Sequence, residues 1–394
     1  MTDRENLTRE DFQERRAAPK RHGTLHRILV LGLTLAVVLL AVMAAAYLDL
    51  SNFDSLRRAL NYNKSDAAGG NTYVYDNDRT NRYALLGERL IVVSTTRMSV
   101  LANDGTVVYA QEVKLDSPAI AIGGKTAAVY SVGGTSLYIL GEKGLVRDMS
   151  AETGSGVISV KLNSSDLLAL VTDKSGYKSA VSVYSASGER SFTFNSSNHY
   201  MLDACVERDG RHAAVVMLGE EDGAFLSTIE RFALDQEAPV SSCELNETLL
   251  YELGSLGSTL VAVTDDRFVA LSGDGSIAGS YDYAYPYLRG STLSGSGFGA
   301  LVLSRYRSGS AGKIVTVGPE GNRIASLDTQ RDVLDISAAG KYLAVLYSDG
   351  LVIYTAELEE YAVFDDTQYA RGVRMRTDGT AVLLGSSGGW LYVP

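Results

Sequence analysis

Hydrophobic positions divide the chain into two unlike regions. Residues 28–48 form an uninterrupted apolar run without a charged side chain. Beyond residue 72, apolar residues occur in short runs rich in Val, Leu and Tyr, separated by Gly or Asp-Gly turns. The first pattern predicts a transmembrane helix, because about 20 apolar residues cross a hydrocarbon layer of ~30 Å. The second pattern predicts an all-β region.

A longer period organises the β-rich region. The clearest copy of the repeating unit has four runs, at Val157–Val160, Leu167–Val171, Val181–Tyr184 and Ser191–Phe194. First runs of successive units begin near residues 84, 118, 157, 201, 250, 288, 332 and 370. The mean spacing of about 41 residues is typical of a four-stranded propeller blade. We therefore predict an eight-bladed β-propeller over residues 72–394. Seven blades is the alternative, because the opening strand of the first unit, Tyr83–Leu86, is weak.

Turn chemistry supports these units. A glycine recurs between the third and fourth strands, where a tight hairpin needs positive φ. It is found in five units, at Asp104-Gly105, Lys143-Gly144, Ser187-Gly188, Asp274-Gly275 and Glu320-Gly321. Two separate β-sandwiches would also show frequent turns, but they would not explain the 41-residue period.

The two ends of the repeat region complement each other. The eighth unit has three strand-like runs, whereas a spare β-rich stretch, Thr72–Tyr75, precedes the first unit. We predict that Thr72–Tyr75 supplies the fourth strand of the eighth blade. Such closure also removes exposed strand edges.

The hairpin Ser99–Tyr109 resembles the third-to-fourth strand hairpin of quinoprotein-like and WD40-like propellers. The whole layout is similar to uncharacterised single-pass, membrane-anchored β-propeller proteins of Gram-positive bacteria. The chain departs from quinoprotein blades, which carry docking tryptophans, because its one tryptophan is Trp390. The Gly-His and Trp-Asp signatures of WD40 blades are absent as well. Because of these departures, the resemblance implies a propeller fold but no quinone cofactor.

Charge near the apolar run predicts its orientation. Five basic residues precede the run closely, and Asp49 and Asp54 follow it first; the basic residues are Arg15, Arg16, Lys20, Arg21 and Arg27. The positive-inside bias then predicts a cytoplasmic basic tail at 1–27, a signal anchor at 28–48 and an extracytoplasmic propeller. Residues 49–71 are expected to be a juxtamembrane linker. A cleaved signal peptide is the alternative, since Ala44–Ala46 offers small residues for cleavage.

The overall charge argues against nucleic acid as a partner. The chain has a net charge of −11, and residues beyond 48 alone carry −13. An acidic body of this size repels phosphate backbones.

Candidate catalytic chemistry is sparse. Two of the four histidines, His22 and His26, fall in the predicted tail, and His199 and His212 have no second ligand at zinc-like spacing. Cys205 and Cys243 are expected in the first and fourth strands of one blade, too far apart for a disulfide. Neighbouring acidic residues are interpreted as solvated turns. We predict no catalytic residues, metal or cofactor.

One stretch stands out as a candidate binding site. It comprises Tyr281, Tyr283, Tyr285, Tyr287 and Arg289, at the passage from the fifth blade to the sixth. If the stretch is extended, its four rings share one face and could stack on a sugar or peptide. The alternative is that the tyrosines pack between blades.

The sequence thus favours a non-enzymatic scaffold that binds an unknown protein or a cell-envelope polymer outside the membrane. Two alternatives remain open. One is a carbohydrate-active enzyme at the propeller face, and the other is a single-pass sensor that signals through its N-terminal tail.

Overall fold

The computed structural model describes residues 30–38, 54, 58 and 72–394, except residues 222, 247, 309, 311 and 368. The chain separates into two units, Met1–Asn61 and Tyr62–Pro394. Residues 30–38, within the predicted span at 28–48, are helical. Of the helices in the described part of the chain, none has the length and apolar character needed to cross a membrane. The predicted tail at 1–27 lies outside the described residues, as does the linker at 49–71 apart from residues 54 and 58.

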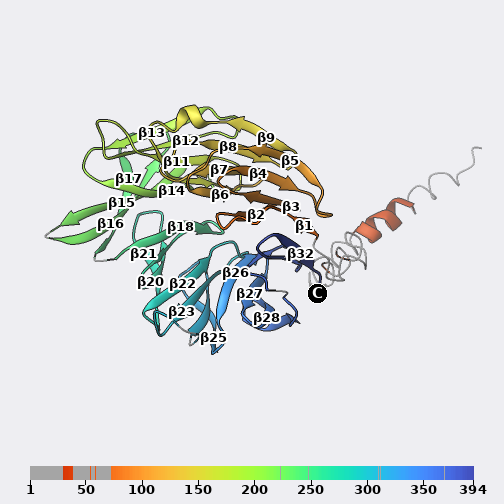
Figure 1. The fold of residues 1–394 in the computed structure, drawn as a ribbon. Coiled ribbons are helices and arrows are strands. Elements are labelled where there is room, and N and C mark those ends of the chain that lie inside the picture. The colour runs from red at the N-terminus through yellow and green to blue at the C-terminus, as the bar shows by residue number, and fades with distance from the viewer. Residues whose placement is uncertain are drawn as a thin grey trace, which may run out of the picture. The chain divides into compact units, whose positions relative to one another are not determined.

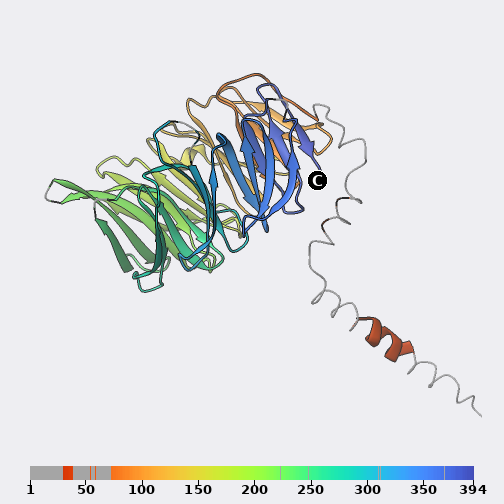
Figure 2. The same ribbon diagram turned by 90° about the horizontal axis from the view of Figure 1, so that it is seen from below.

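The second unit is a ring of eight four-stranded antiparallel sheets (Figures 1 and 2). From the innermost strand outward, blades 1 to 4 are β2 (Arg82–Leu86), β3 (Arg89–Val93), β4 (Arg97–Leu101) and β5 (Val107–Glu112); β6 (Pro118–Ile122), β7 (Thr126–Ser131), β8 (Leu137–Gly141) and β9 (Gly144–Asp148); β10 (Val157–Leu162), β11 (Leu168–Thr172), β12 (Ser179–Tyr184) and β13 (Arg190–Ser196); β14 (Tyr200–Val206), β15 (His212–Glu221), β16 (Ala224–Ala233) and β17 (Pro239–Asn246).

A short 3-10 helix, η1 (Ser150–Glu152), joins blades 2 and 3. Blades 5 to 8 follow the same strand order as blades 1 to 4. Their strands are β18 (Leu250–Leu256), β19 (Thr259–Thr264), β20 (Arg267–Leu271) and β21 (Ile277–Asp282); β22 (Tyr287–Thr292), β23 (Gly299–Ser304), β24 (Gly312–Val317) and β25 (Arg323–Thr329); β26 (Val333–Ala339), β27 (Tyr342–Tyr347), β28 (Gly350–Thr355) and β29 (Glu360–Phe364); β30 (Gly372–Met375), β31 (Ala381–Leu384), β32 (Gly388–Tyr392) and β1 (Tyr73–Val74).

The predicted eight blades are confirmed, and the seven-bladed alternative is wrong. The weak first run does form an innermost strand, β2, which pairs with β3 from Arg82↔Val93 to Leu86↔Arg89. The predicted starts of the eight units lie within about two residues of the observed innermost strands. Two β-sandwiches are excluded, because each sheet has its neighbours in sequence on either side around the ring (Figure 1).

The hydrophobic core is divided among the junctions between blades. Eight clusters of buried residues each join two adjacent blades. Ile91 of blade 1 packs with Val129 of blade 2, for example, and Leu301 of blade 6 packs with Val263 of blade 5. Middle strands are therefore covered on both faces, which explains why β23 and β27 are buried along their whole length and have no polar alternation.

Ring closure occurs through the predicted stretch. β1 pairs with β32 at Tyr73↔Gly389 and Val74↔Gly388, so the prediction that Thr72–Tyr75 completes the eighth blade is confirmed. In Figure 1 the orange β1 lies beside the dark blue β32. Tyr73 is fully buried among residues of blades 8 and 1, including Leu90 and Val382.

Two side chains reinforce this closure. The Tyr75 hydroxyl donates to the carbonyl oxygens of Gly385 and Gly388, at 3.0 and 2.7 Å. Burial and the neighbouring Tyr83 raise the pKa of the Tyr75 phenol, which stays protonated and able to donate. From the other end, Arg376 of blade 8 is buried and hydrogen-bonds the Tyr73 hydroxyl at 3.0 Å. The same guanidinium nitrogen donates to Glu88 O and Asn103 Oδ1 of blade 1.

Closure also depends on a close backbone approach at Gly105. This turn glycine has φ +81°, and a Cβ added there would lie 1.6 Å from the carbonyl oxygen of Thr72. Gly297 has almost the same φ, +80°, but nothing lies within 4 Å of its added Cβ. A comparison of substitutions at Gly105 and Gly297 therefore distinguishes backbone strain, which both positions share, from the steric clash with the closing strand, which only Gly105 has.

We expect Gly105→Ala to destabilise the propeller much more than Gly297→Ala. Gly297→Ala should cost about 1–2 kcal/mol, the penalty of a left-handed conformation for a residue with a Cβ. Gly105→Ala adds displacement of Thr72 and should cost several-fold more. Urea unfolding of the full chain, followed by circular dichroism, measures both free energies of unfolding. Equal losses for the two variants would contradict the role assigned to Gly105.

Candidate functional site

The innermost strands share a local irregularity that shapes the central channel. A β-bulge occurs near the start of this strand in blades 3 to 7, where the register with the second strand shifts. Bulges redirect side chains and are frequent beside functional sites. In blade 4 the residue after the shift is Asp203, and in blade 7 it is Asp335.

Both aspartates fasten their blade to the next one. Asp335 Oδ2 accepts hydrogen bonds from the backbone N–H of Val373 at 2.9 Å and from Arg374 Nη1 at 2.8 Å, both in blade 8. Asp203 accepts from the backbone N–H of Leu253 in blade 5 and forms an ion pair with Lys161 of blade 3. Because both aspartates bond to neighbouring blades, part of the charge in the channel stabilises the fold.

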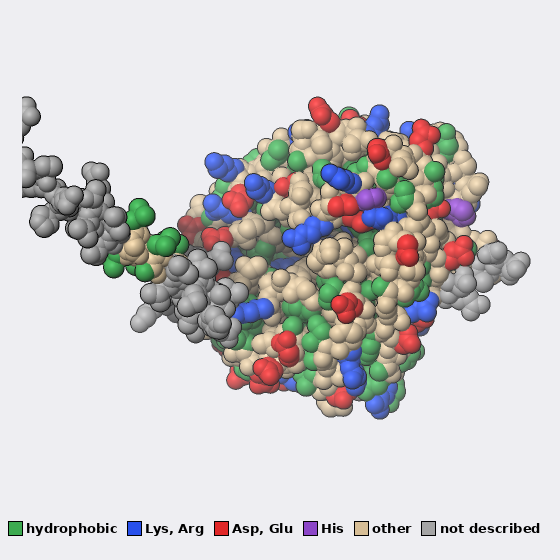
Figure 3. Space-filling model, turned by 180° about the vertical axis from the view of Figure 1, so that it is seen from behind, with side chains coloured by type: hydrophobic (Ala, Val, Ile, Leu, Met, Phe, Trp, Pro, Cys, Tyr) green, Lys and Arg blue, Asp and Glu red, His purple; other side chains and the backbone are tan. Residues whose placement is uncertain are grey.

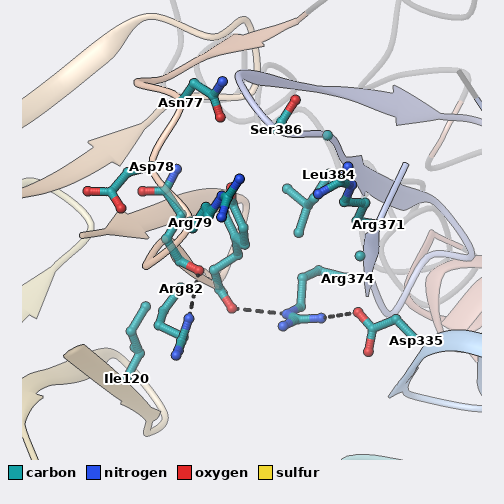
Figure 4. Close-up of a pocket in the computed structure, with 14 residues that line it drawn as sticks. Asn77, Asp78, Arg79, Arg82, Ile120, Asp335, Arg371, Arg374, Leu384 and Ser386 are labelled. Carbon is teal, nitrogen blue, oxygen red and sulfur yellow. Dashed lines mark hydrogen bonds and ion pairs between the residues drawn. The ribbon is translucent and has the colours of Figure 1, made fainter. Parts of the chain in front are cut away.

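One face of the ring carries the segments that join the outermost strand of each blade to the innermost strand of the next. We call it the crossover face. A pocket of about 810 Å³ opens there, where blades 7, 8 and 1 meet, and it reaches into the channel as far as Ile120 of β6. Its charged lining comprises Asp78, Arg79, Arg82, Asp335, Arg371 and Arg374 (Figure 4). We call this the arginine pocket.

Two segments supply the arginines. Arg79 lies in the loop from β1 to β2 and Arg82 is the first residue of β2, whereas Arg371 and Arg374 lie just before and within β30. In Figure 4 the first pair lies on one side of the pocket and the second pair on the other. Ring closure brings the two pairs together, although nearly 300 residues separate them in the sequence.

The four guanidinium groups are not equivalent. Arg374 is held by Asp335 and by the carbonyl oxygen of Tyr83, to which its Nε donates at 3.0 Å. Among the described residues, Arg82 donates to the nearby carbonyl oxygens of Thr80 and Asn81 alone. Within the described part of the chain, neither it nor Arg79 nor Arg371 forms an ion pair, and all three side chains are exposed.

The second carboxylate of the pocket is already satisfied locally. Asp78 Oδ1 accepts from the N–H and the hydroxyl of Thr80 at 2.8 and 2.7 Å, and these bonds lower the pKa of Asp78. Asp78 is therefore ionised at neutral pH but does not neutralise an arginine. The pocket keeps a local positive excess on a protein whose net charge is −11.

The tyrosines of the predicted binding site do not form one continuous exposed surface. Residues 284–286 form a bend between β21 and β22, so the stretch is not extended throughout. Tyr281, Tyr283 and Tyr285 pack against the cluster between blades 5 and 6, which is the alternative raised from the sequence. Tyr287 is 40% exposed, and Arg289 donates to the carbonyl oxygen of Arg307. Binding at this stretch stays a prediction.

Tyr285 also contacts charged side chains. Its ring lies 5.0 Å from the guanidinium of Arg305, which also donates to its hydroxyl at 3.0 Å. The same hydroxyl donates to Asp328 at 3.3 Å. Burial raises the pKa of Tyr283. These contacts stabilise the crossover between the blades.

Exposed aromatic residues gather elsewhere on the crossover side of blades 3 to 5. Tyr177 follows β11, Tyr200 begins β14 and Tyr251 lies near the start of β18. Strands β15 and β16 are ten residues long, and their hairpin projects beyond its neighbours with Phe225 exposed near its tip (Figures 1 and 2). Figure 3 shows acidic, basic and apolar side chains interspersed over the face seen from behind.

The surroundings of His212 and of the two cysteines show how these side chains are used within blade 4. His212 Nδ1 lies 2.5 Å from Asp209, and Glu207 nearby receives two bonds from Arg231. Glu207, Asp209 and His212 together have metal-ligating atoms, but Arg231 already neutralises the Glu207 carboxylate. Cys205 and Cys243 lie in β14 and β17, the first and fourth strands of one blade, as predicted; both are free and buried. Burial raises the pKa of Cys205 to about 12 and that of Cys243 above its ordinary value.

Sequence reasoning did not identify the arginine pocket. A usable signal was present, since Arg79 and Arg82 follow the predicted closing strand and Arg371 and Arg374 directly follow the predicted start of the eighth unit. Predicted closure places these two Arg-x-x-Arg pairs at one junction. Each pair alone has the ordinary appearance of a charged turn.

Eight four-stranded blades around a channel define a β-propeller. The chain belongs to DUF5711, a family of unknown function, whose profile matches residues 61–362. No curated protein matches the chain.

Solved structures resemble the chain in fold. The C-terminal WD40 domain of Sif2 has a TM-score of 0.56 at 11% identity, covering 83% of this chain and 100% of that one. The Dos1 propeller has a TM-score of 0.53 at 9% identity, covering 82% and 94%. BamB from Moraxella catarrhalis has a TM-score of 0.49 at 12% identity, covering 80% and 96%. At such low identities, the similarity to the Sif2 and Dos1 propellers shows the fold alone.

We expect Asp335→Asn to lower the free energy of unfolding by about 1–2 kcal/mol. The change weakens two bonds to blade 8, one of them an ion pair with Arg374, at a site that is partly open to solvent. Asp282→Asn, at the exposed end of β21, is the control and should have almost no effect. Chemical unfolding of both full-length variants measures the difference. An Asp335→Asn protein as stable as the control would show that the contact between blades 7 and 8 does not need this carboxylate.

Proposed function

We propose that this protein is a membrane-anchored β-propeller, held outside the cytoplasm, that binds a protein or a cell-envelope polymer without catalysing a reaction. The arginine pocket carries the proposal. It offers unpaired hydrogen-bond donors on a ring whose blades are fastened to one another by buried contacts. Such rigid presentation suits recognition, because little conformational entropy is lost when a ligand binds.

The membrane part of the proposal rests on the apolar run at 28–48 and its basic N-terminal flank. About 20 apolar residues are long enough to span the bilayer, and the positive-inside bias keeps the tail at 1–27 in the cytoplasm. The propeller is then extracytoplasmic. Its free thiols do not argue against that compartment, since both are buried.

Thiol labelling of intact cells tests the orientation. Ser187→Cys places a thiol in an exposed turn of the propeller, and Thr8→Cys places one in the predicted tail. We expect a membrane-impermeant maleimide to label Ser187→Cys in intact cells, and Thr8→Cys only after permeabilisation. The unmodified chain should remain unlabelled, because Cys205 and Cys243 are buried with raised pKa values. Labelling of the tail but not the propeller in intact cells would reverse the proposed topology.

Sedimentation with envelope material tests the binding role. Purified full chain in detergent micelles is incubated with insoluble envelope polymer or with extracted envelope proteins, and bound chain is measured. We expect saturable binding to one of the two, with unlabelled chain competing against labelled chain. Binding to neither fraction would reject the proposed function, and turnover of the polymer by the chain would reject its non-enzymatic part.

A further inference from the structure

The charge of the arginine pocket selects for an anion. Three exposed guanidinium groups, those of Arg79, Arg82 and Arg371, face a common space and have no carboxylate partner among the described residues. Guanidinium groups bind phosphate and carboxylate through paired N–H donors, so one anionic group can bridge two of them. The opposed pairs in Figure 4 suit a ligand with more than one charge.

The remaining lining argues against a simple inorganic anion. Asp78 lies at the edge of the same pocket, where Figure 4 shows its carboxylate on the side away from Arg371 and Arg374, and this ionised acceptor favours a ligand that offers hydroxyl groups there. A hydroxylated ligand can donate to Asp78 while its charged groups contact the arginines. Asn77 and Ser386 add an amide and a hydroxyl to the rim.

An apolar surface completes the pocket. Ile120, Leu384 and Tyr83 line it, and the Tyr83 ring packs against the ring of Tyr75, with the ring centroids 5.2 Å apart. Aromatic rings present apolar faces on which the C–H groups of a sugar ring can pack. A volume of about 810 Å³ also exceeds what a single small anion would fill.

We infer that the arginine pocket binds an anionic carbohydrate, a polyhydroxylated chain that carries carboxylate or phosphate groups. This inference rests on the proposed function, because it names the chemistry of the ligand and selects the polymer over the protein. The arginines would bind the charged groups, Asp78 the hydroxyl groups, and Tyr83 the sugar face.

The chain contains its own reporter for this site. Trp390 is the one tryptophan, and it is buried in β32 of the eighth blade. An added Cβ at Gly385 would lie 3.5 Å from the Trp390 ring, so this ring packs close to a residue that lines the pocket. Tryptophan fluorescence of the full chain therefore observes the blade that contributes Arg371 and Arg374.

The test titrates detergent-solubilised full chain with four probes: trigalacturonate, glucose 1-phosphate, maltotriose and inorganic phosphate. We expect saturable binding of at least one of the two anionic saccharides, with affinity that falls as salt concentration rises. Maltotriose and inorganic phosphate should bind at least about tenfold more weakly. Calorimetry gives the same dissociation constants independently of Trp390. The stronger of the two anionic probes shows whether the pocket prefers carboxylate or phosphate.

Matched variants test whether the probes bind in the arginine pocket. Arg79→Gln and Arg371→Gln should each raise the Kd about tenfold, whereas Arg323→Gln, an exposed arginine at the start of β25, should leave it unchanged. Thermal unfolding confirms that the three variants are folded. Equal binding of maltotriose, equal binding of inorganic phosphate, or insensitivity to both pocket variants would overturn the inference.

Failure of this inference can be distinguished from failure of the proposed function. If envelope sedimentation is retained while the anionic saccharides do not bind, the protein is a binding module and the assigned ligand class is wrong. If the saccharides bind at the pocket while sedimentation with envelope material fails, the inference stands and the proposed function does not.

Discussion

Pairing of β1 with β32 is the constraint on which the rest of the propeller depends. Each apolar cluster lies between two blades, so an open ring would expose the residues that blades 8 and 1 bury together. The pairing covers only two residues, Tyr73 and Val74. Its stability therefore comes from side chains around it, chiefly buried Tyr73, the Tyr75 hydroxyl and the Arg376 guanidinium. Gly105 permits the close approach of the strand that all of them need.

The candidate site is a product of the same closure. The loop that follows β1 contains Arg79, and its course is restricted at one end by Tyr75 and at the other by β2. Arg374 is restricted by Asp335 and by the carbonyl oxygen of Tyr83 in blade 1. Guanidinium groups from both ends of the ring thus share one pocket with little freedom to separate. Any change that opens the ring should affect the pocket and stability together.

Blade number and closure could be predicted because both depend on local patterns that repeat. Turn glycines and strands buried on both faces recur in the sequence at the blade period, and Thr72–Tyr75 was a strand without a partner. Side-chain surroundings do not repeat in this way. The tyrosines at 281–287 alternate as an extended strand would, but the bend at 284–286 and the core between blades 5 and 6 decide where their rings lie. The arginine pocket was missed because its two halves meet only through closure.

Charge at the channel mouth has two separate roles, and the bonds that each charged group forms with neighbouring blades distinguish them. Asp203 and Asp335 accept backbone N–H groups from the following blade as well as a cation, so their charge is used within the fold. Arg79 and Arg371 are exposed and form no such bond with any residue that the structure describes, so their removal should leave the ring intact. Because these guanidinium groups form no ion pair within the described residues, they stay available to an anionic ligand. The pocket, rather than the channel or the aromatic residues of blades 3 to 5, is therefore the best-supported binding site.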